Sequence, residues 1–220
     1  MKKTTIQGAI AVAIILLATA GALYYRNKTL YTYTGYLDKE AMTIDGEEIE
    51  LRELTYYFMM EEESVNETAL EYNGKNPLEY WGLYINQAFV SVEARNTAVD
   101  YFVRDRIYSK LAKEAGLKLT KQEEEEINMA AEDFLDGMTK KQKALRMTDE
   151  DLLLALREHQ LADDYVLYKA KKRGLTISEE VLSAYYGLNS KYFKEAKVEH
   201  KVELNKRVLE KVSLGRLSVN

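Results

Sequence analysis

Gly116-Leu117-Lys118-Leu119-Thr120 and Gly174-Leu175-Thr176-Ile177-Ser178 are two versions of one corner. In each, a charged amphipathic segment runs into a glycine, which can adopt the left-handed conformation that ends a helix. An apolar residue follows, and a hydroxyl residue then caps the next helix. The sequence therefore predicts a mainly α fold in which two helices end and restart by the same device. A scaffold of this kind, without visible reaction chemistry, points toward binding.

The composition also favours long helices. The chain has 220 residues, of which 46% are hydrophobic, so it is long enough to bury one sizeable core. Proline occurs once and glycine 11 times, which is typical of long helices and not of a turn-rich sandwich or barrel. Cysteine is absent, and this excludes disulfides, thiol catalysis and thiolate metal sites.

The body of the chain is acidic. Residues 1–28 hold four basic side chains and no acid, so they contribute +4 to the net charge of −5 and the remainder carries −9. Such a surface repels phosphate backbones and anionic lipids, and no local cluster of Lys or Arg interleaved with aromatic residues offsets it. We therefore expect no nucleic-acid partner.

The beginning of the sequence predicts a membrane segment. Residues 6–25 carry no charge and are mostly apolar, and about 20 such residues cross a bilayer as a helix. Ala18-Thr19-Ala20 also fits a secretory cleavage site, but apolar residues continue beyond it to Tyr24 and Tyr25, which suit the membrane interface. We expect residues 1–28 to form a cytoplasmic tip and a single-pass anchor, with the main domain extracytoplasmic. A cleaved signal peptide and a secreted domain are the alternative.

The rest of the chain divides into three parts. A polar linker over 29–40 precedes a helical domain over 41–195, and 196–220 form a short tail. Apolar residues on both sides of Asp45-Gly46 are a strong signal for a small β-hairpin at the start of the domain. The tail opens with a stretch over 197–204 that alternates as a strand does, and its fold is otherwise left open.

Helical spacing of apolar residues predicts five helices in the domain. The longest, over 77–115, would have about ten turns, so part of it should project from the core as an arm. Capping boxes at Thr120 with Glu123 and at Thr148 with Asp151 mark the starts of two others. The five expected helices span 51–63, 77–115, 120–137, 149–173 and 178–186.

No motif for catalysis or for metal or cofactor binding is visible. The two histidines, His159 and His200, lack the pairing with Glu that marks a zinc hydrolase, and we interpret them as surface or packing residues. The acidic runs 61–63 and 123–126 fall on expected helices and lack the turn of a calcium loop, so we interpret them as solvated faces. We predict no catalytic, cofactor-binding or metal-binding residues.

Aromatic and sulfur-containing residues are the positive feature. They gather in Tyr56-Tyr57-Phe58-Met59-Met60 and near the start of the longest expected helix. Five consecutive large residues of a helix cannot all face one core. Either neighbours cover the helix on both sides, or the residues line an adaptable apolar groove for unfolded polypeptide, since Met and Tyr repack around varied partners. The candidate client-binding residues are Tyr56, Tyr57, Phe58, Met59, Met60, Trp81, Tyr84 and Phe89.

The order of the segments resembles that of a known family, the SurA/PrsA-type peptidyl-prolyl isomerases, which are extracytoplasmic parvulin-type foldases. Over about residues 42–195, the chain is similar to their chaperone half. The resemblance implies a SurA-N-like or trigger-factor-like helical chaperone domain that holds unfolded clients, while a separate parvulin domain catalyses Xaa-Pro isomerisation. It rests on Ile44-Asp45-Gly46-Glu47-Glu48-Ile49, on Leu111-Ala112-Lys113-Glu114-Ala115-Gly116-Leu117 with Thr120, and on Leu152 to Lys169 before Gly174-Leu175-Thr176-Ile177-Ser178-Glu179-Glu180-Val181 and Tyr185-Tyr186.

A parvulin domain is not expected in the 34 residues that follow Tyr186, because a chain below about 40 residues rarely folds alone. We therefore expect a membrane-anchored extracytoplasmic holdase that binds unfolded or newly exported polypeptides without catalysis or cofactor. Its homodimerisation is left open. Two alternatives also stay open. One is peptidyl-prolyl isomerase activity, of the chain or of a complex that contains it, and the other is a non-catalytic scaffold for one folded partner.

Overall fold

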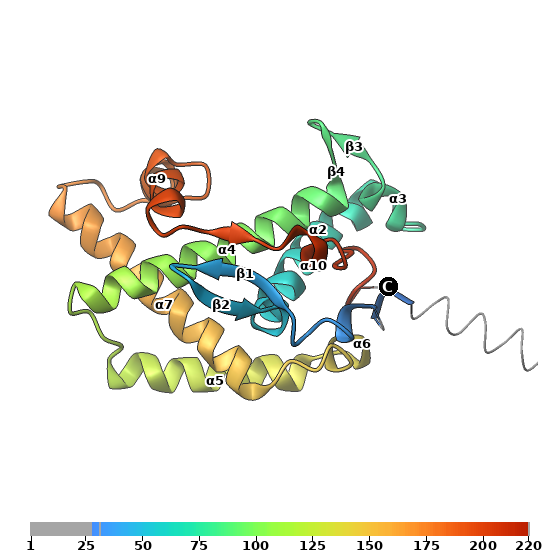
Figure 1. Cartoon of the computed structure of the whole chain (residues 1–220), viewed down its shortest axis with the longest axis horizontal. Coiled ribbons are helices and arrows are strands. Elements are labelled where there is room, and N and C mark those ends of the chain that lie inside the picture. The colour runs from blue at the N-terminus through green and yellow to red at the C-terminus, as the bar shows by residue number, and fades with distance from the viewer. Residues whose placement is uncertain (1–27, 31, 220) are drawn as a thin grey trace, which may run out of the picture.

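The computed structural model describes residues 28–30 and 32–219, and it is mainly helical, as the sequence predicts. Two long helices, α4 (Val90–Glu114) and α7 (Asp149–Lys172), pack against each other at its centre. A third, α2 (Thr55–Tyr72), packs against α4. Figure 1 shows a helical lobe near one end of α4 and a β-hairpin that projects near the other end.

A three-stranded sheet, in the order β2-β1-β5, accompanies the helices. β1 (Glu40–Ile44) and β2 (Glu47–Glu50) form the predicted hairpin, and its turn residues Asp45 and Gly46 have φ of 54° and 83°. A two-residue turn that matches the twist of its strands requires this left-handed backbone. The third strand, β5 (Glu203–Leu204), pairs with β1 in antiparallel orientation.

The predicted single helix over 77–115 is wrong. The structure has a short helix, α3 (Leu78–Trp81), then a hairpin of β3 (Tyr84–Ile85) and β4 (Ala88–Phe89), and only then α4. The turn residues Asn86 and Gln87 have φ of 51° and 71°, which a right-handed helix does not contain. Strands of two residues are too short to show alternation, and here their apolar residues coincide with helical spacing. The projecting element is a hairpin and not a helical arm (Figure 1).

The helix predicted over 51–63 is present and longer than expected. A short 3-10 turn, η1 (Leu51–Leu54), leads directly into α2, which continues to Tyr72. Glu67, Ala69 and Glu71 favour helix formation, and residues 64–72 continue the helix beyond its predicted end. α2 therefore crosses a large part of the core and meets both η1 and α7 in addition to α4.

Both glycine corners are confirmed. Gly116 and Gly174 have φ of 83° and 67°. The amide of Leu117 donates to the carbonyl of Ala112 at 2.9 Å, and the equivalent bond at the second corner, from Leu175 to Ala170, is 3.0 Å long. These are the bonds that close a helix C-terminus around a left-handed glycine.

Three helices begin at caps that the sequence predicts. The hydroxyls of Thr120 and Thr148 each accept a hydrogen bond from the amide three residues later and complete a capping box. The hydroxyl of Ser178 also accepts a hydrogen bond from the amide three residues later, without the reciprocal bond of a capping box. The helices so placed are α5 (Lys121–Gly137), α7 and α8 (Glu179–Tyr186), and one further turn, α6 (Lys140–Lys143), lies between α5 and α7.

The last part of the described chain packs onto the same core. α9 (Lys191–Glu199) runs across the expected domain boundary at residue 195, and within the strand-like stretch over 197–204 only β5 is a strand. α10 (Lys206–Leu209) follows, and we call residues 206–219 the strap. The buried apolar side chains of the strap are Val208, Leu209, Val212, Leu214 and Leu217.

The expected linker over 29–40 also contacts the core. Tyr33 is fully buried, and its hydroxyl lies 2.7 Å from the hydroxyl of Thr55 on α2. The predicted membrane segment, residues 6–25, lies outside the described residues. Within residues 28–30 and 32–219, no helix has both the length and the apolar character needed to cross a bilayer.

Candidate functional site

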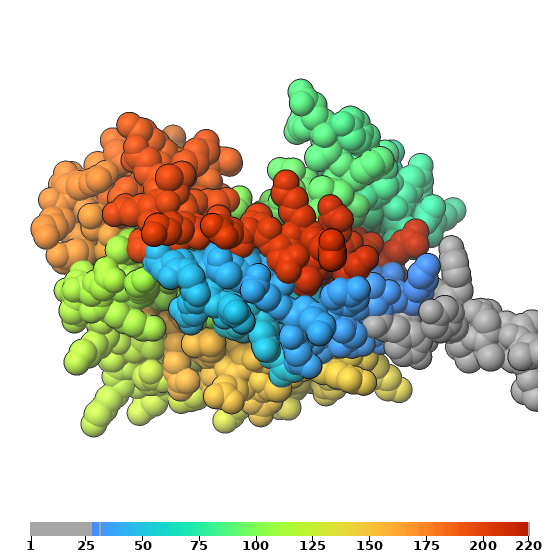
Figure 2. Space-filling view, viewed as in Figure 1, coloured from blue at the N-terminus to red at the C-terminus, as the bar shows by residue number. Residues whose placement is uncertain are grey.

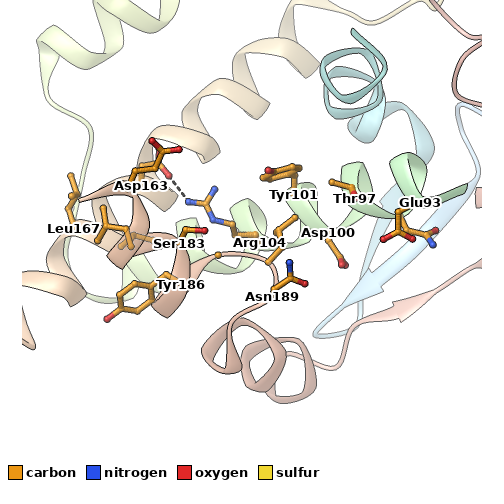
Figure 3. Close-up of a pocket in the computed structure, with 16 residues that line it drawn as sticks. Glu93, Thr97, Asp100, Tyr101, Arg104, Asp163, Leu167, Ser183, Tyr186 and Asn189 are labelled. Carbon is orange, nitrogen blue, oxygen red and sulfur yellow. Dashed lines mark hydrogen bonds and ion pairs between the residues drawn. The ribbon is translucent and has the colours of Figure 1, made fainter. Parts of the chain in front are cut away.

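A groove of about 740 Å³ runs along one face of α4. Its floor comes from residues spaced three and four positions apart, which lie on the same side of a helix. Figure 3 shows these side chains in a row, with the neighbouring elements around them. The residues of the floor are Glu93, Asn96, Thr97, Asp100, Tyr101 and Arg104.

The wall of the groove is built by α7, by α8 and by the loop after α8. Val166 and Leu167 of α7, with Leu182 of α8, supply its apolar part, and Ser183 and Asn189 supply polar groups. A groove of this composition can take up both an apolar side chain and a polar main chain. It therefore suits a segment of polypeptide better than a small, wholly apolar molecule.

A cluster of tyrosines holds this wall in place. The hydroxyl of Tyr108 on α4 donates to the carbonyl of Tyr186 at the end of α8, at 3.1 Å. The hydroxyls of Tyr165 on α7 and Tyr192 on α9 lie 2.7 Å apart, and the rings of Tyr186 and Tyr192 meet edge to face at 5.1 Å. Because such aromatic pairs add to the free energy of packing, they position α8 and α9 on α4 and α7.

The β3–β4 hairpin exposes apolar side chains at the other end of α4. Tyr84 pairs with Phe89 across the hairpin, and their ring centroids are 5.3 Å apart. The exposed fractions are 65% for Tyr84, 43% for Ile85 and 51% for Phe89. Figure 2 shows a notch between the hairpin and the lobe of α8 and α9, and in Figure 1 α4 passes beneath this notch.

Carboxylates dominate the charge of the groove. The only cation among its lining residues, Arg104, donates hydrogen bonds to Asp105 at 3.0 Å and to Asp163 at 2.6 Å, so its charge is already balanced. Within the described part of the chain, Glu93 and Glu179 form no ion pair. The groove therefore presents a negative potential to any ligand.

Asp105 joins three helices behind the groove. Its buried carboxylate accepts a hydrogen bond from the hydroxyl of Tyr57 on α2 at 3.2 Å, and it lies 2.8 Å from Nδ1 of His159 on α7. The bond to Asp105 raises the pKa of His159. Since Arg104 and His159 share this carboxylate, the network fixes the floor of the groove relative to α7.

The second histidine is also structural. Nδ1 of His200 lies 2.8 Å from a carboxylate oxygen of Asp45 in the β1–β2 turn, and the amide of Asp45 donates to the carbonyl of His200 at 2.9 Å. Lys110 of α4 also donates to Asp45, and the bonds from His200 and Lys110 lower the pKa of this carboxyl. The hairpin turn is thereby attached to α4 and to the segment that follows α9.

The eight candidate residues do not form one surface. Tyr57, Phe58, Met59 and Trp81 are buried, with exposed fractions of 6%, 0%, 1% and 3%. Tyr56 is half-buried against Phe134. Neighbours cover α2 on both sides, which is the first of the two explanations that the sequence allowed. The candidates that remain exposed are Met60, Tyr84 and Phe89.

The groove floor was not predicted from the sequence. Its residues lie on the polar side of α4, and the sequence reasoning followed the apolar side of the same helix. One signal was present: Asn96 interrupts the helically spaced apolar residues of α4, Tyr101 lies outside them, and both side chains line the groove. A search for polar residues repeated at helical spacing could have found the floor, although the wall depends on tertiary packing.

The comparisons add no relative. No family model matches the chain, and neither a curated protein nor a solved structure matches it significantly. Within the described residues, no group of three or more His, Asp or Glu side chains is arranged to hold a metal ion. The function is therefore argued from the groove and the hairpin.

Proposed function

We propose that the protein is a chaperone-like holdase that binds unfolded or newly exported polypeptides along α4. The observation that supports this function best is the combination of the groove with the exposed aromatic pair of the hairpin. Tyr84 and Phe89 offer apolar contact at one end of α4, and the groove offers apolar and polar contacts along it. A polypeptide segment can use both, because its apolar side chains and its main chain alternate along its length.

The resemblance to the chaperone half of SurA/PrsA-type foldases is consistent with this proposal. The helical corners and the β1–β2 hairpin that carry the resemblance are present. In the same proposal, residues 6–25 tether the protein to the membrane and the groove faces newly exported chains. Since the sequence contains no recognisable catalytic motif, we propose holding of the client without isomerisation.

The first test measures aggregation of a chemically unfolded, proline-containing client in the presence of the full chain. The wild-type protein should suppress aggregation, and the double variant Tyr84→Ser/Phe89→Ser should suppress it less because apolar contact is lost. Met129→Ser is the matched control, since Met129 is also 65% exposed but lies on α5, across the molecule from the hairpin. Equal suppression by the wild type and the double variant would show that the hairpin does not bind clients.

A second measurement locates the client and separates holding from catalysis. Hydrogen exchange with and without client should show protection over residues 84–104 and 182–189, and no change over α5. The refolding rate of the client, measured alongside, should not increase. Faster proline-limited refolding would favour an isomerase instead, and saturable binding of one folded protein would favour a scaffold.

A further inference from the structure

A buried carboxylate on α2 holds the strap. Glu62 is fully buried, and its two oxygens accept hydrogen bonds from the main chain of the strap and from one hydroxyl. The amide donors are Gly215 at 2.5 Å, Leu217 at 2.8 Å, Ser218 at 2.5 Å and Val219 at 3.3 Å, and the hydroxyl of Ser218 lies at 2.5 Å. Successive amides that converge on an anion in this way form a nest.

The contact depends on the main chain more than on side chains. A buried carboxylate is tolerated only when hydrogen bonds replace its lost hydration, and four of the five donors to Glu62 are backbone amides. Any segment that can adopt the same curled backbone presents the same donors. The group that Glu62 binds is therefore the main chain of a polypeptide segment.

Trp81 supplies the selective part of this site. A Cβ atom placed on Gly215, whose φ is 87°, would overlap the indole ring of Trp81. The residue at this position must therefore be glycine. On either side of it, Leu214 and Leu217 are buried while Arg216 is exposed, so the segment that fits has an apolar residue, a glycine, any residue and a second apolar residue.

The strap does not satisfy every polar group that it covers. Trp81 is 3% exposed, and its indole Nε1 has no hydrogen-bond partner among the described residues. A buried donor without an acceptor costs about 1–3 kcal/mol. A ligand that placed a carbonyl against Nε1 would recover this free energy, which gives another segment a means to compete with the strap.

We propose that Glu62 and Trp81 form a second polypeptide-binding site, which the strap occupies in the resting protein and which a client segment of the pattern apolar-Gly-x-apolar takes over. Removing the strap exposes Trp81, which lies three residues before Tyr84 of the hairpin. The apolar surface of the hairpin then extends toward α2. The existence of the site is independent of the proposed function, and only its use by clients rests on that function.

The chain contains a built-in probe, because Trp81 is its only tryptophan. In the full-length protein, an unfolded client that carries a short-range quencher beside an apolar-Gly-x-apolar segment should lower the emission of Trp81, because the segment that replaces the strap lies against the indole ring. Suppressed client aggregation with unchanged emission would overturn the displacement of the strap while leaving the holdase function intact. If the client neither stays soluble nor changes the emission of Trp81, the holdase function is overturned. The peptide-binding test below examines the Glu62–Trp81 site without a client.

The second test uses the nine-residue peptide of sequence 211–219 and the full-length variant Gly215→Val. The valine should expel the strap from Trp81, so the labelled peptide should bind the variant at least ~10-fold more tightly than the wild type, in which the strap competes. A peptide that carries Gly215→Val should not bind. Glu62→Gln, added to the full-length variant, should weaken binding of the unmodified peptide.

Three outcomes would contradict the proposal that Glu62 and Trp81 form a polypeptide-binding site. One is failure of the peptide to bind a variant that keeps its helical circular dichroism. Another is loss of that signal in Gly215→Val, since the strap would then be an indispensable part of the core. The third comes from the wild type: if the amides of 215, 217 and 218 exchange no faster than those at the centre of α4, the strap does not open locally.

Discussion

The aromatic cluster of α2 and the aromatic pair of the β3–β4 hairpin have similar residues and opposite surroundings. On α2, the ring of Tyr57 meets Phe102 of α4 at 5.5 Å, and Phe58 meets Tyr33 at 6.3 Å from another direction. On the hairpin, Tyr84 and Phe89 contact each other and are otherwise largely open to solvent. A run of large residues in a sequence therefore does not identify a binding surface, because exposure depends on the elements that cover the run.

The largest effect on the free energy of unfolding is expected in the buried aromatic cluster of α2. Phe58→Ala should lower the free energy of unfolding by about 3–5 kcal/mol, because it removes a fully buried ring and leaves a cavity. Urea denaturation of the full chain, followed by circular dichroism, measures the change. A loss below about 1 kcal/mol would mean that Phe58 is not packed as described.

The adjacent methionines sharpen the comparison within α2. Met59 is 1% exposed and Met60 is 41% exposed. Met59→Ala should cost about 2–5 kcal/mol, whereas Met60→Ala should change the free energy of unfolding by less than about 1 kcal/mol. Each variant is the control for the other, and equal losses would contradict the assigned faces of the helix.

A buried carboxyl group on α7 should make the stability of the protein depend on pH. Glu158 on α7 lies 3.2 Å from Arg106, and burial raises its pKa from 4.5 to about 7 despite this cation. The folded state then binds a proton that the unfolded state releases above about pH 4.5. This contribution to stability is fully present below pH 4.5 and is lost as the pH rises through about 7.

The measurement is urea denaturation at several pH values between 5 and 8. Over this range, the wild type should lose about 1–3 kcal/mol relative to Glu158→Gln, which cannot titrate. His159→Gln is the companion variant, because the raised pKa of His159 acts in the same direction. Parallel pH profiles for the wild type and Glu158→Gln would show that Glu158 stays ionised in the folded protein.

The smallest effect on stability is expected for the exposed aromatic pair of the β3–β4 hairpin. Tyr84→Ser and Phe89→Ser should each change the free energy of unfolding by no more than about 0.5 kcal/mol, since both rings are more than half exposed. The same denaturation assay tests this. A large loss would place the hairpin within a packed interface of the folded protein.

Features set by local chemistry could be predicted from the sequence. The corners at Gly116 and Gly174, the caps at Thr120 and Thr148, and the Asp45-Gly46 turn each depend on a few neighbouring residues, and the structure confirms them. Their residue types fit special backbone conformations or satisfy free amides, so the pattern alone indicates the structure.

Features set by distant packing could not be predicted in this way. The Asn86-Gln87 turn uses residues that also occur in helices, so only the structure shows that the chain reverses there. The groove needs α8 placed against α4 by Tyr108 and Tyr186, which are far apart in sequence. Burial of the α2 cluster likewise depends on Tyr33 and Phe102, and the run over 56–60 carries no sign of either.

The pairing of β1 with β5 bears on how the chain folds. Asn205 donates to the carbonyl of Glu40 across 165 positions of sequence, so this edge of the sheet closes only after a long loop has been ordered. Until residues 203–205 are synthesised and arrive, β1 has a free hydrogen-bonding edge, which is a template for unwanted pairing with other chains. A protein proposed to protect nascent chains would itself need protection until β5 had been made.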